Sequence, residues 1–325
     1  MKHDPQTEMS PQPTAPNASK KITVIILSVV VIAAIAVTVS QHFGGPLPTW
    51  DEIYEAAGFT EEPSSTHEND LAVHFVDVGQ GDCIFVQTPT GESLLIDAGE
   101  RGNEQTVVSY IEEYGDDTLE YVIATHPHSD HIGSLDDAIR AYAVQNVLMP
   151  RVTESNTPTS SAYINFLAAV KQSKAKAIAA KPGYTFSLGK GTCTVLGPIE
   201  QSDSLNNISV VLRLDWGETS FLFTGDAEKA EEKTILNSKY AEFLDVDVLK
   251  MGHHGSRTSS TASFLKAVTP DYCVISCGTG NDYGHPHQET LQKLDKLSTE
   301  VLRTDLSGSI RFYSNGTTLS VESDR

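Results

Sequence analysis

The order of hydrophobic and polar positions divides the chain into an unpatterned start, one long apolar run and a patterned remainder. Residues 1–19 are rich in Pro, Ser, Thr, Gln and Asn and show no apolar period, which is typical of a disordered tail. Residues 22–40 carry no charge and are almost all apolar or small. Residues 41–69 combine Gly, Pro and acidic residues, which indicates a linker with one short helix over Trp50–Ala57. The pattern over residues 70–325 predicts one domain.

Short apolar, β-branched runs in this domain predict strands, and longer stretches with helical spacing between several of them predict helices. The expected strands are Leu71–Val78, Cys83–Gln87, Ser93–Ile96, Tyr121–Ala124, Asn146–Met149, Thr192–Leu196, Ile208–Leu214, Ser220–Phe223, Val246–Leu249, Tyr272–Ser276 and Ile310–Tyr313. The expected helices are Glu104–Glu113, Leu135–Tyr142, Ser160–Gln172, Ala227–Asn237, Thr261–Val268 and Gln288–Leu297. Strands dominate the opening and then alternate with helices. We therefore expect an α/β (α+β) fold of two mixed sheets with helices on their outer faces.

The apolar run of residues 22–40 has the length of a membrane helix, because it would span roughly 28 Å. Lys20 and Lys21 flank its N-terminal end, and no Lys or Arg follows in the next fifty residues. The positive-inside rule then places the N-terminus in the cytoplasm and the domain outside the cell. We expect a single-pass transmembrane anchor over residues 20–40. A cleaved signal peptide is the alternative, but the run is long and Gln41-His42-Phe43 resembles no cleavage site.

The formal net charge of −20 weighs against a nucleic-acid partner. Proteins that bind nucleic acid usually show a basic face, whereas this sequence has no basic run after residue 21. No basic nucleic-acid-binding patch is therefore evident, although metal ions could still mediate such binding. The four cysteines form no CxxC pair, and we expect them to be buried free thiols.

The strongest chemical signal is the segment Thr125-His-Pro-His-Ser-Asp-His131, which directly follows the expected strand Tyr121–Ala124. A loop at the end of a strand can direct several side chains into one cavity, and imidazole and carboxylate groups suit zinc or manganese. We expect two divalent metal ions, zinc or manganese. The first would bind His126 and His128, and the second Asp130 and His131.

This His-x-His-x-Asp-His pattern resembles the signature of the metallo-β-lactamase superfamily, whose fold is a four-layer αββα sandwich. The resemblance implies roles for three further segments. Asp97, in Leu95-Ile-Asp-Ala-Gly99, would buttress the ligand loop. Asp226, in Thr224-Gly-Asp226, would bridge the two metals, although it could also simply cap a following helix. His253, in Lys250-Met-Gly-His-His-Gly-Ser256, would be the last ligand, with His254 as a near neighbour and an almost equal candidate.

Further segments resemble the hydrolase domain of ComEC-like DNA-uptake competence proteins over about residues 70–322. They are His74-Phe-Val-Asp-Val-Gly-Gln-Gly-Asp82, Asn207-Ile-Ser209 and Tyr283-Gly-His-Pro-His287. Asp77 and Asp82 would lie around the metals, although Asp82 could instead cap the turn. Many superfamily members have another ligating histidine between the signature and the bridging Asp, but this sequence has none between His131 and Asp226. Asn207 or a water would fill that position.

The resemblance implies a membrane-anchored extracellular metal-dependent hydrolase of the phosphodiesterase or nuclease type, using a metal-bridged hydroxide. Catalytic roles are expected for Asp130, His254 and His285, the last two as candidate proton donors. His287 is a further candidate or a surface residue. The substrate would be a small phosphodiester, a nucleic acid or a cell-envelope component. Alternatives are hydrolysis of another ester or amide, such as a cell-wall phosphocholine ester or a lactone, and a non-catalytic metal-binding sensing domain. Complete competence proteins carry a many-helix channel region, so with one apolar run we expect no channel here.

Overall fold

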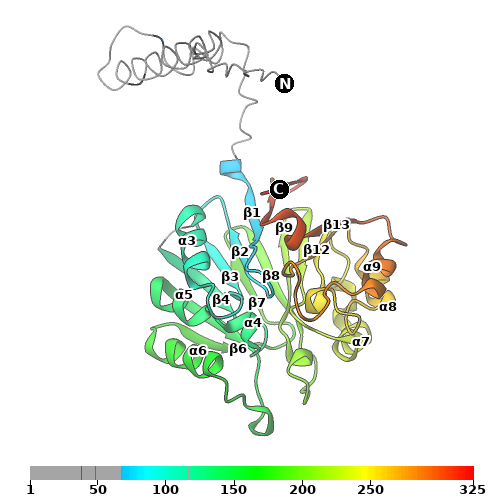
Figure 1. Cartoon of the computed structure of the whole chain (residues 1–325), viewed down its shortest axis with the longest axis horizontal. Helices are drawn as coiled ribbons and strands as arrows, with labels where there is room; N and C mark the ends of the chain where they lie inside the picture. The colour runs from blue at the N-terminus through cyan, green and yellow to red at the C-terminus, as the bar shows by residue number, and fades with distance from the viewer. Residues whose placement is uncertain (1–37, 39–47, 49–66, 116) are drawn as a thin grey trace, which may run out of the picture. The chain divides into compact units, whose positions relative to one another are not determined.

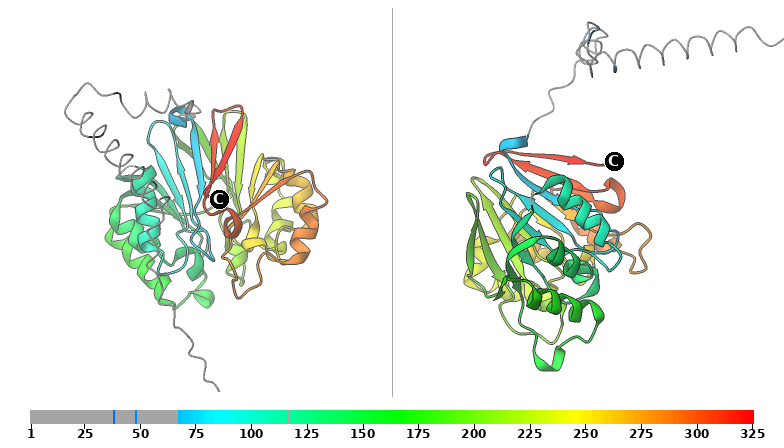
Figure 2. Two further views of the ribbon diagram at one scale, coloured as in Figure 1. Left: turned by 45° about the horizontal axis from the view of Figure 1, so that its top comes forward. Right: turned by 90° about the vertical axis from the view of Figure 1, so that its left-hand side faces the viewer.

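Two β-sheets packed face to face form the centre of the fold (Figures 1 and 2). The computed structural model describes Thr38, Pro48 and residues 67–115 and 117–325, and His67–Arg325 forms one compact unit. One sheet has the order β15-β14-β1-β2-β3-β4-β5-β6 and the other β13-β12-β11-β10-β9-β8-β7. The strands of the first are β1 (Leu71–Phe75), β2 (Ile84–Gln87), β3 (Ser93–Ile96), β4 (Thr118–Ile123), β5 (Ala143–Met149), β6 (Lys176–Ala179), β14 (Ile310–Ser314) and β15 (Leu319–Ser323). Those of the second are β7 (Thr185–Leu188), β8 (Gly191–Gly197), β9 (Val211–Trp216), β10 (Thr219–Phe223), β11 (Val248–Lys250), β12 (Tyr272–Ile275) and β13 (Glu300–Arg303).

Each sheet joins an antiparallel part to a parallel part, as the pattern of strands and helices predicts. Strands β3, β4, β5 and β6 run parallel to one another, and so do β10, β11, β12 and β13. Parallel neighbours need crossover connections, and helices provide them. The helices are α3 (Glu104–Tyr114), α4 (Ser129–Ile132), α5 (Leu135–Ala141), α6 (Ser161–Gln172), α7 (Lys229–Leu236), α8 (Ala262–Val268), α9 (Gln288–Leu294) and α10 (Thr304–Ser307). Helices α6 and α8 begin where the hydroxyls of Ser160 and Thr261 accept hydrogen bonds from the first turn.

Alternating side chains on the strands make three apolar layers. Leu94 and Ile96 of β3 point into the core between the sheets, whereas Leu95 points outward against α3, α5 and α6. Phe221 and Phe223 of β10 likewise point inward, and Leu222 packs against α7, α8 and α9. Figure 2 shows the helices on the two outer sides with the sheets between them. The predicted αββα order is confirmed.

Four strands of the structure were not predicted from the sequence, namely β6, β7, β13 and β15. All four are the outermost strands of their sheets. Three segments predicted near the N-terminal end lie outside the described residues. They are the tail of residues 1–19, the anchor of residues 20–40 apart from Thr38, and the helix Trp50–Ala57. Within the residues that the structure does describe, none of the helices has the length and apolar character needed to cross a bilayer.

His74 on β1 is a buried imidazole whose charge state couples stability to pH. Its Nδ1 lies 2.9 Å from the Tyr110 hydroxyl, and its side chain is 1 % exposed. Burial, assisted by the nearby Arg311, lowers the pKa of His74 to about 3. Between pH 3 and about pH 6.5, His74 is therefore protonated in the unfolded chain and neutral in the folded chain. Acidification in this range therefore favours unfolding through His74.

We expect His74→Phe to flatten the loss of stability between pH 6.5 and pH 4. In the parent, His74 alone should remove roughly 1.4 kcal/mol of unfolding free energy for each pH unit below 6.5. Urea unfolding at several pH values measures the slope. Tyr110→Phe is the matched control, because it removes the same hydrogen bond but keeps the ionisable group. Equal slopes for the parent and His74→Phe would contradict the prediction.

Candidate metal centre

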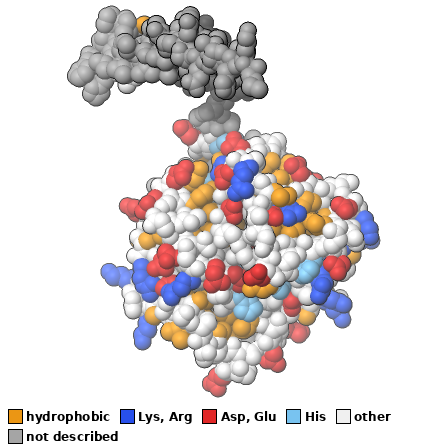
Figure 3. Space-filling model, viewed as in Figure 1, with side chains coloured by type: hydrophobic (Ala, Val, Ile, Leu, Met, Phe, Trp, Pro, Cys, Tyr) orange, Lys and Arg blue, Asp and Glu red, His pale blue; other side chains and the backbone are white. Residues whose placement is uncertain are grey.

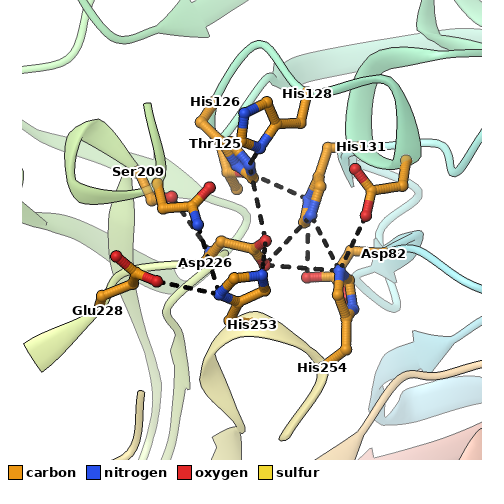
Figure 4. A network of polar contacts seen from close by, with 12 residues as sticks. Asp82, Thr125, His126, His128, His131, Ser209, Asp226, Glu228, His253 and His254 are labelled. Atoms are coloured by element: carbon orange, nitrogen blue, oxygen red, sulfur yellow. Dashed lines mark hydrogen bonds and ion pairs between the residues drawn. The ribbon is translucent and has the colours of Figure 1, made fainter. Parts of the chain in front are cut away.

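Loops that follow four parallel strands meet at one edge of the sandwich. Strands β3 and β4 are parallel neighbours in the first sheet, and β10 and β11 in the second, so their carboxyl ends share an edge in each sheet. Asp97 follows β3, the segment 125–131 follows β4, Asp226 follows β10, and His253 and His254 follow β11. Figure 4 shows side chains from both sheets pointing toward one another there.

Asp226 lies between two groups of histidines, with one carboxylate oxygen toward each. Its Oδ1 is 3.2 Å from His131 Nε2 and 3.6 Å from His254 Nε2. Its Oδ2 is 3.7 Å from His126 Nε2 and 3.6 Å from His253 Nε2. The carboxylate is therefore placed to bridge two cations, rather than to cap the start of a helix.

The potential ligand atoms form two compact groups. Within each group they lie within 4.8 Å of one another, and the groups are Asp82, His131, Asp226 and His254, and His126, His128 and Asp226. His131 Nε2 and His254 Nε2 are 3.2 Å apart, and His126 Nε2 and His128 Nδ1 are 3.0 Å apart. Two nitrogens on one tetrahedral zinc ion lie about 3.3 Å apart. The residues therefore fit a candidate site for two metal ions.

An excess of negative charge supports the same conclusion. Asp82, Asp97, Asp130 and Asp226 surround the histidines, and Lys250 is the one Lys or Arg among the described residues that pairs with any of them. Asp226 Oδ1 is buried and accepts no well-directed hydrogen bond. Buried carboxylates are costly without cations, so this cluster favours either protonated histidines or bound metal ions.

The pKa values of the histidines reflect this charge. Burial opposes protonation of His131, but Asp226, Asp97 and Asp130 together raise the pKa of His131 well above its ordinary value. Against the same effect of burial, Asp226 and Asp82 raise the pKa of His254 to about 9. Burial, with His131 nearby, lowers the pKa of His126 well below its ordinary value. His126 is thus neutral, which is the form that binds metals.

The structure distinguishes the two adjacent histidines. His254 is 1 % exposed, its Nδ1 lies 3.0 Å from the Ser276 carbonyl oxygen, and its Nε2 lies 3.3 Å from Asp130 Oδ2. His253 is half-buried, with Nδ1 3.4 Å from Glu228 Oε1. His254 therefore occupies the position beside His131, where the sequence favoured His253. His253 lies instead on the side of His126 and His128. This is the ligand group for which the sequence has no third histidine between His131 and Asp226. Both adjacent histidines have left-handed backbone conformations, with φ of 50° and 51°.

We expect His254→Ala to lower the metal content more than His253→Ala does. His254 contributes a buried nitrogen within 3.2 Å of His131, whereas His253 is at the rim and outside both compact groups. Elemental analysis of dialysed protein should give about one ion per chain for His254→Ala and nearly the parent content for His253→Ala. A larger loss in His253→Ala would reverse the assignment.

Asp97 holds the ligand loop in place. Its Oδ1 accepts a hydrogen bond of 2.8 Å from the Thr125 backbone N–H, and its Oδ2 lies 2.6 Å from the Thr125 hydroxyl and 2.7 Å from His131 Nδ1. His131 Nδ1–H donated to this carboxylate leaves Nε2 free toward Asp226. Burial raises the pKa of Asp97. The structure therefore gives Asp97 the buttressing position that the resemblance implies.

Asp82 and Lys250 form a fully buried ion pair behind the histidines. Lys250 Nζ lies 2.7 Å from Asp82 Oδ2 and donates to the Met251 carbonyl at 2.9 Å. Asp82 approaches the Nδ1 atoms of His254 and His131, at 3.3 and 3.9 Å. Although Asp82 belongs to one compact group, it faces the nitrogens that point away from Asp226. Asp82 is therefore better suited to orient the rings, and Asp130, on the Nε2 side, to bind a metal. Burial opposes ionisation of Asp82, but Lys250 and His254 lower its pKa to about 2.

The Gly79–Gly81 turn packs directly against the ligand loop. A Cβ atom at Gly81, where φ is 137°, would lie 2.2 Å from the Asp130 carbonyl oxygen. The Asp82 backbone N–H donates to this same oxygen at 3.2 Å. Only glycine permits this approach, which brings Asp82 to the site.

Two predicted residues have other partners. Asp77 accepts a hydrogen bond from the Gly79 N–H and pairs with Arg325 at 3.3 Å, so the structure does not bring it to the metals. The Oδ1 atom of Asn207 accepts hydrogen bonds from the backbone N–H groups of Glu228 and Glu231 at the start of α7. The oxygen that would ligate a metal is therefore already engaged in capping a helix.

The site opens into a cleft of about 280 Å³, lined in part by His128, Asp130, Asp226, Tyr283 and His285. His285 is 9 % exposed, and neither of its ring nitrogens has a hydrogen-bond partner among the described residues. Tyr283 is 64 % exposed and stacks on His285 with ring centroids 5.6 Å apart. Burial, with His254 and His253 nearby, lowers the pKa of His285 to about 4. The cleft thus combines the His285 imidazole, which has no hydrogen-bond partner, with the exposed aromatic ring of Tyr283.

Sequence reasoning assigned no role to Thr125, Ser209, Lys250 or Tyr283. The Ser209 hydroxyl accepts a hydrogen bond from the Asp226 backbone N–H at 3.1 Å, and the Thr125 hydroxyl lies 3.1 Å from His126 Nδ1. All four lie in segments that the sequence analysis recognised, and this membership was the available signal. Thr125 directly precedes His126, and Lys250 precedes His253 by three residues, but no feature of the segment 207–209 marks Ser209 as a neighbour of Asp226.

Comparison with known proteins identifies the family to which the sequence is similar. A profile described as the Metallo-beta-lactamase superfamily matches residues 76–279. "ComE operon protein 3" of Bacillus subtilis is 32% identical over 263 residues, which are 75% of this chain and 33% of that protein. "Competence protein ComA" of Neisseria gonorrhoeae is 30% identical over 294 residues, which are 88% of this chain and 38% of that protein. The chain therefore spans about a third of the length of these relatives.

Solved structures support the fold. CmlA, a diiron beta-hydroxylase from Streptomyces venezuelae, superimposes with a TM-score of 0.50 at 17% identity, over 84% of this chain and 58% of that one. A mutant of CmlA gives a TM-score of 0.51 at 15% identity, with the same shares covered. At this identity the likeness concerns the two-sheet sandwich alone.

Proposed function

The chain belongs to the metallo-beta-lactamase superfamily of metal-dependent hydrolases, and from this premise we propose that it is a phosphodiesterase of the nuclease type. The substrate would be a phosphodiester bond in a nucleic acid or a smaller molecule. The domain would act outside the cell membrane, held there by an anchor over residues 20–40 that contains the apolar run of residues 22–40.

The observation that carries this proposal is the position of Asp226. One buried carboxylate directs its two oxygens to two groups of histidines, at the floor of an open cleft. A purely structural metal site is closed and needs neither a shared ligand nor a cleft. When bound, a pair of divalent cations supplies Lewis acidity, acidifies water and neutralises charge on both sides of a phosphoryl group.

The residues around the cations have separable tasks. Asp97 and Asp82 fix the rings of His131 and His254 from their Nδ1 sides. Asp130 lines the cleft with Oδ2 3.3 Å from His254 Nε2, where it can bind a metal ion and help to orient a reacting group. His285 faces the same cleft with both ring nitrogens uncommitted, so its N–H can hydrogen bond to the leaving oxygen.

The relatives favour a nucleic acid over other esters. "ComE operon protein 3" and "Competence protein ComA" are competence proteins, and a third relative, from Haemophilus influenzae and 30% identical over 247 residues, is "Recombination protein 2". Competence for DNA uptake and recombination are both processes that involve DNA. The present chain matches about a third of each, so the inference is confined to the domain that is shared.

Two measurements on the full-length protein test the proposal. Elemental analysis should give about two divalent ions per chain. Manganese- or zinc-loaded protein should hydrolyse bis-p-nitrophenyl phosphate and single-stranded DNA, whereas protein treated with a chelator should not. Turnover of a lactone or a phosphocholine ester without turnover of either phosphodiester would assign another substrate. With both ions bound and no ester hydrolysed, the domain would be a binding or sensing module.

A further inference from the structure

A second groove, outside the metal cleft, lies between three helices of the outer layer. It has a volume of about 720 Å³ and is lined by residues of α7, α8, α9 and the loop after β11. Its charged lining residues are Lys229, Lys233, Arg257, Lys293 and Glu289. Four cations and one carboxylate give a local charge of +3, on a protein whose net charge is −20.

The cations of this basic groove form no close ion pairs, and the carboxylates of Glu232 and Glu289 act only on Lys293, from a greater distance. Within the part of the chain that the structure describes, Lys229, Lys233, Arg257 and Lys293 make no ion pair within 4.0 Å. Lys229 and Lys233 lie four residues apart and therefore on one face of α7. Lys293 is anchored by the carbonyl oxygens of Ser259 and Ser260, at 2.9 and 2.7 Å. In Figure 3, Lys and Arg side chains lie at both the left and the right edge of this face, and those at the right lie near histidine side chains.

The loop after β11 contributes residues to both the metal cleft and the basic groove. The loop after β11 carries His253 and His254 at one end and Arg257 at the other. The Arg257 backbone N–H donates to His287 Nδ1 at 3.2 Å, and the His287 ring contacts His285, with centroids 4.9 Å apart. A substrate held in the cleft beside His285 can therefore extend past His287 into the groove.

We propose that the basic groove binds the phosphates of a single-stranded nucleic acid on one side of the bond that is cleaved. This inference rests on the proposed function, because it concerns the substrate of the same site. Unpaired cations spaced along a groove match a chain of repeating phosphates, and a single small phosphodiester would not reach them. The exposed Tyr283 at the opposite end of the row of rings offers a face on which a base can stack. The cations come from separate segments, which explains why the sequence shows no basic run.

The test compares two triple variants of the full-length protein. Lys229→Gln, Lys233→Gln and Arg257→Gln together remove three exposed charges from the groove. Lys171→Gln, Lys174→Gln and Lys176→Gln together remove three exposed charges at the opposite outer layer, on and after α6. The measured quantity is kcat/KM for a 12-nucleotide single-stranded oligothymidylate, divided by kcat/KM for bis-p-nitrophenyl phosphate. We expect this ratio to fall about tenfold or more in the groove variant at low salt, and to stay near the parent value in the control variant.

Salt dependence gives a second readout. Each phosphate contact contributes a slope of about −0.7 to a plot of log affinity against log salt for single strands. Removing three contacts should make the slope for the oligothymidylate less steep by about 2. The measurement uses fluorescence anisotropy in a chelator, which prevents turnover. Because binding is measured without hydrolysis, loss of the slope in the groove variant supports the groove even if the phosphodiesterase proposal fails.

Three results would overturn the proposal. The groove variant could keep the parent ratio and slope, or the control variant could lose as much as the groove variant. Alternatively, the groove variant could keep oligothymidylate binding and lose binding to vesicles containing 30 mol % phosphatidylglycerol, which would make the groove a membrane-facing surface.

Discussion

Asp226→Asn is expected to lower kcat/KM for bis-p-nitrophenyl phosphate by on the order of 10³-fold or more, and to leave less than two metal ions per chain. The amide has the shape of the carboxylate but carries no charge and only one oxygen. It can therefore no longer face His126 and His131 with an anionic oxygen each, as Asp226 does. Activity assays and elemental analysis of the same preparation measure both effects.

The matched control for this variant is Asp247→Asn. Asp247 precedes β11, at the end of that strand remote from the metals, and accepts hydrogen bonds from the backbone and hydroxyl of Ser220. We expect it to keep both ions and the parent activity. If Asp226→Asn retained two ions and turnover within tenfold of the parent, Asp226 would not be a shared ligand.

Lys250→Met is expected to destabilise the protein by about 3–5 kcal/mol, the largest effect on stability that we predict. Lys250 and Asp82 are both at most 1 % exposed and lie 2.7 Å apart. Methionine fills the space of the lysine stem but leaves Asp82 as a buried anion without its cation. Urea unfolding in a chelator, compared with the parent, gives the change without a contribution from bound metal.

The double variant Lys250→Met, Asp82→Asn separates charge from packing. It lacks both charges, so we expect it to recover part of the stability that Lys250→Met loses. A double variant that is no more stable than Lys250→Met would show that the loss comes from packing of the side chain. Asp82→Asn should also weaken metal binding by about 10- to 100-fold, because Asp82 orients His254.

Strands that are buried in the fold could be predicted from the sequence, whereas exposed strands at the edges of the sheets could not. Runs such as Ser93–Ile96 are buried on both faces and therefore read as continuous apolar segments, which the sequence reveals directly. The four outermost strands have no such environment. In β6 and β15, for example, no residue is buried, and β7 alternates buried and exposed positions over only four residues. Their pairing depends on a neighbouring strand that is already in place, which local sequence does not show.

In the candidate site too, the residues that local sequence predicts differ from those that only the assembled fold brings together. The ligand loop of residues 126–131 is local, so its spacing alone indicated a metal site. The choice between His253 and His254 depends on two successive left-handed residues that reverse the direction of the chain, and nothing in the identity of the two side chains predicts that. The ion pair of Lys250 and Asp82 joins β11 of the second sheet to the loop between β1 and β2 of the first. It could be seen only once both sheets were assembled.

The left-handed backbone at His253 and His254 has a consequence for how quickly metal ions exchange. Two such residues in succession cost about 1–3 kcal/mol each. When the loop after β11 opens, this backbone strain is released, so opening costs less free energy and occurs more often. Each opening moves His254 away from the metal ion that it would share with His131. No residue from His126 to His131 has a positive φ. We therefore expect isotope exchange into the loaded protein to show two phases, the faster at His131 and His254; a single phase would count against it. The cluster would then hold one resident ion and one whose occupancy follows the concentration of free metal around the protein.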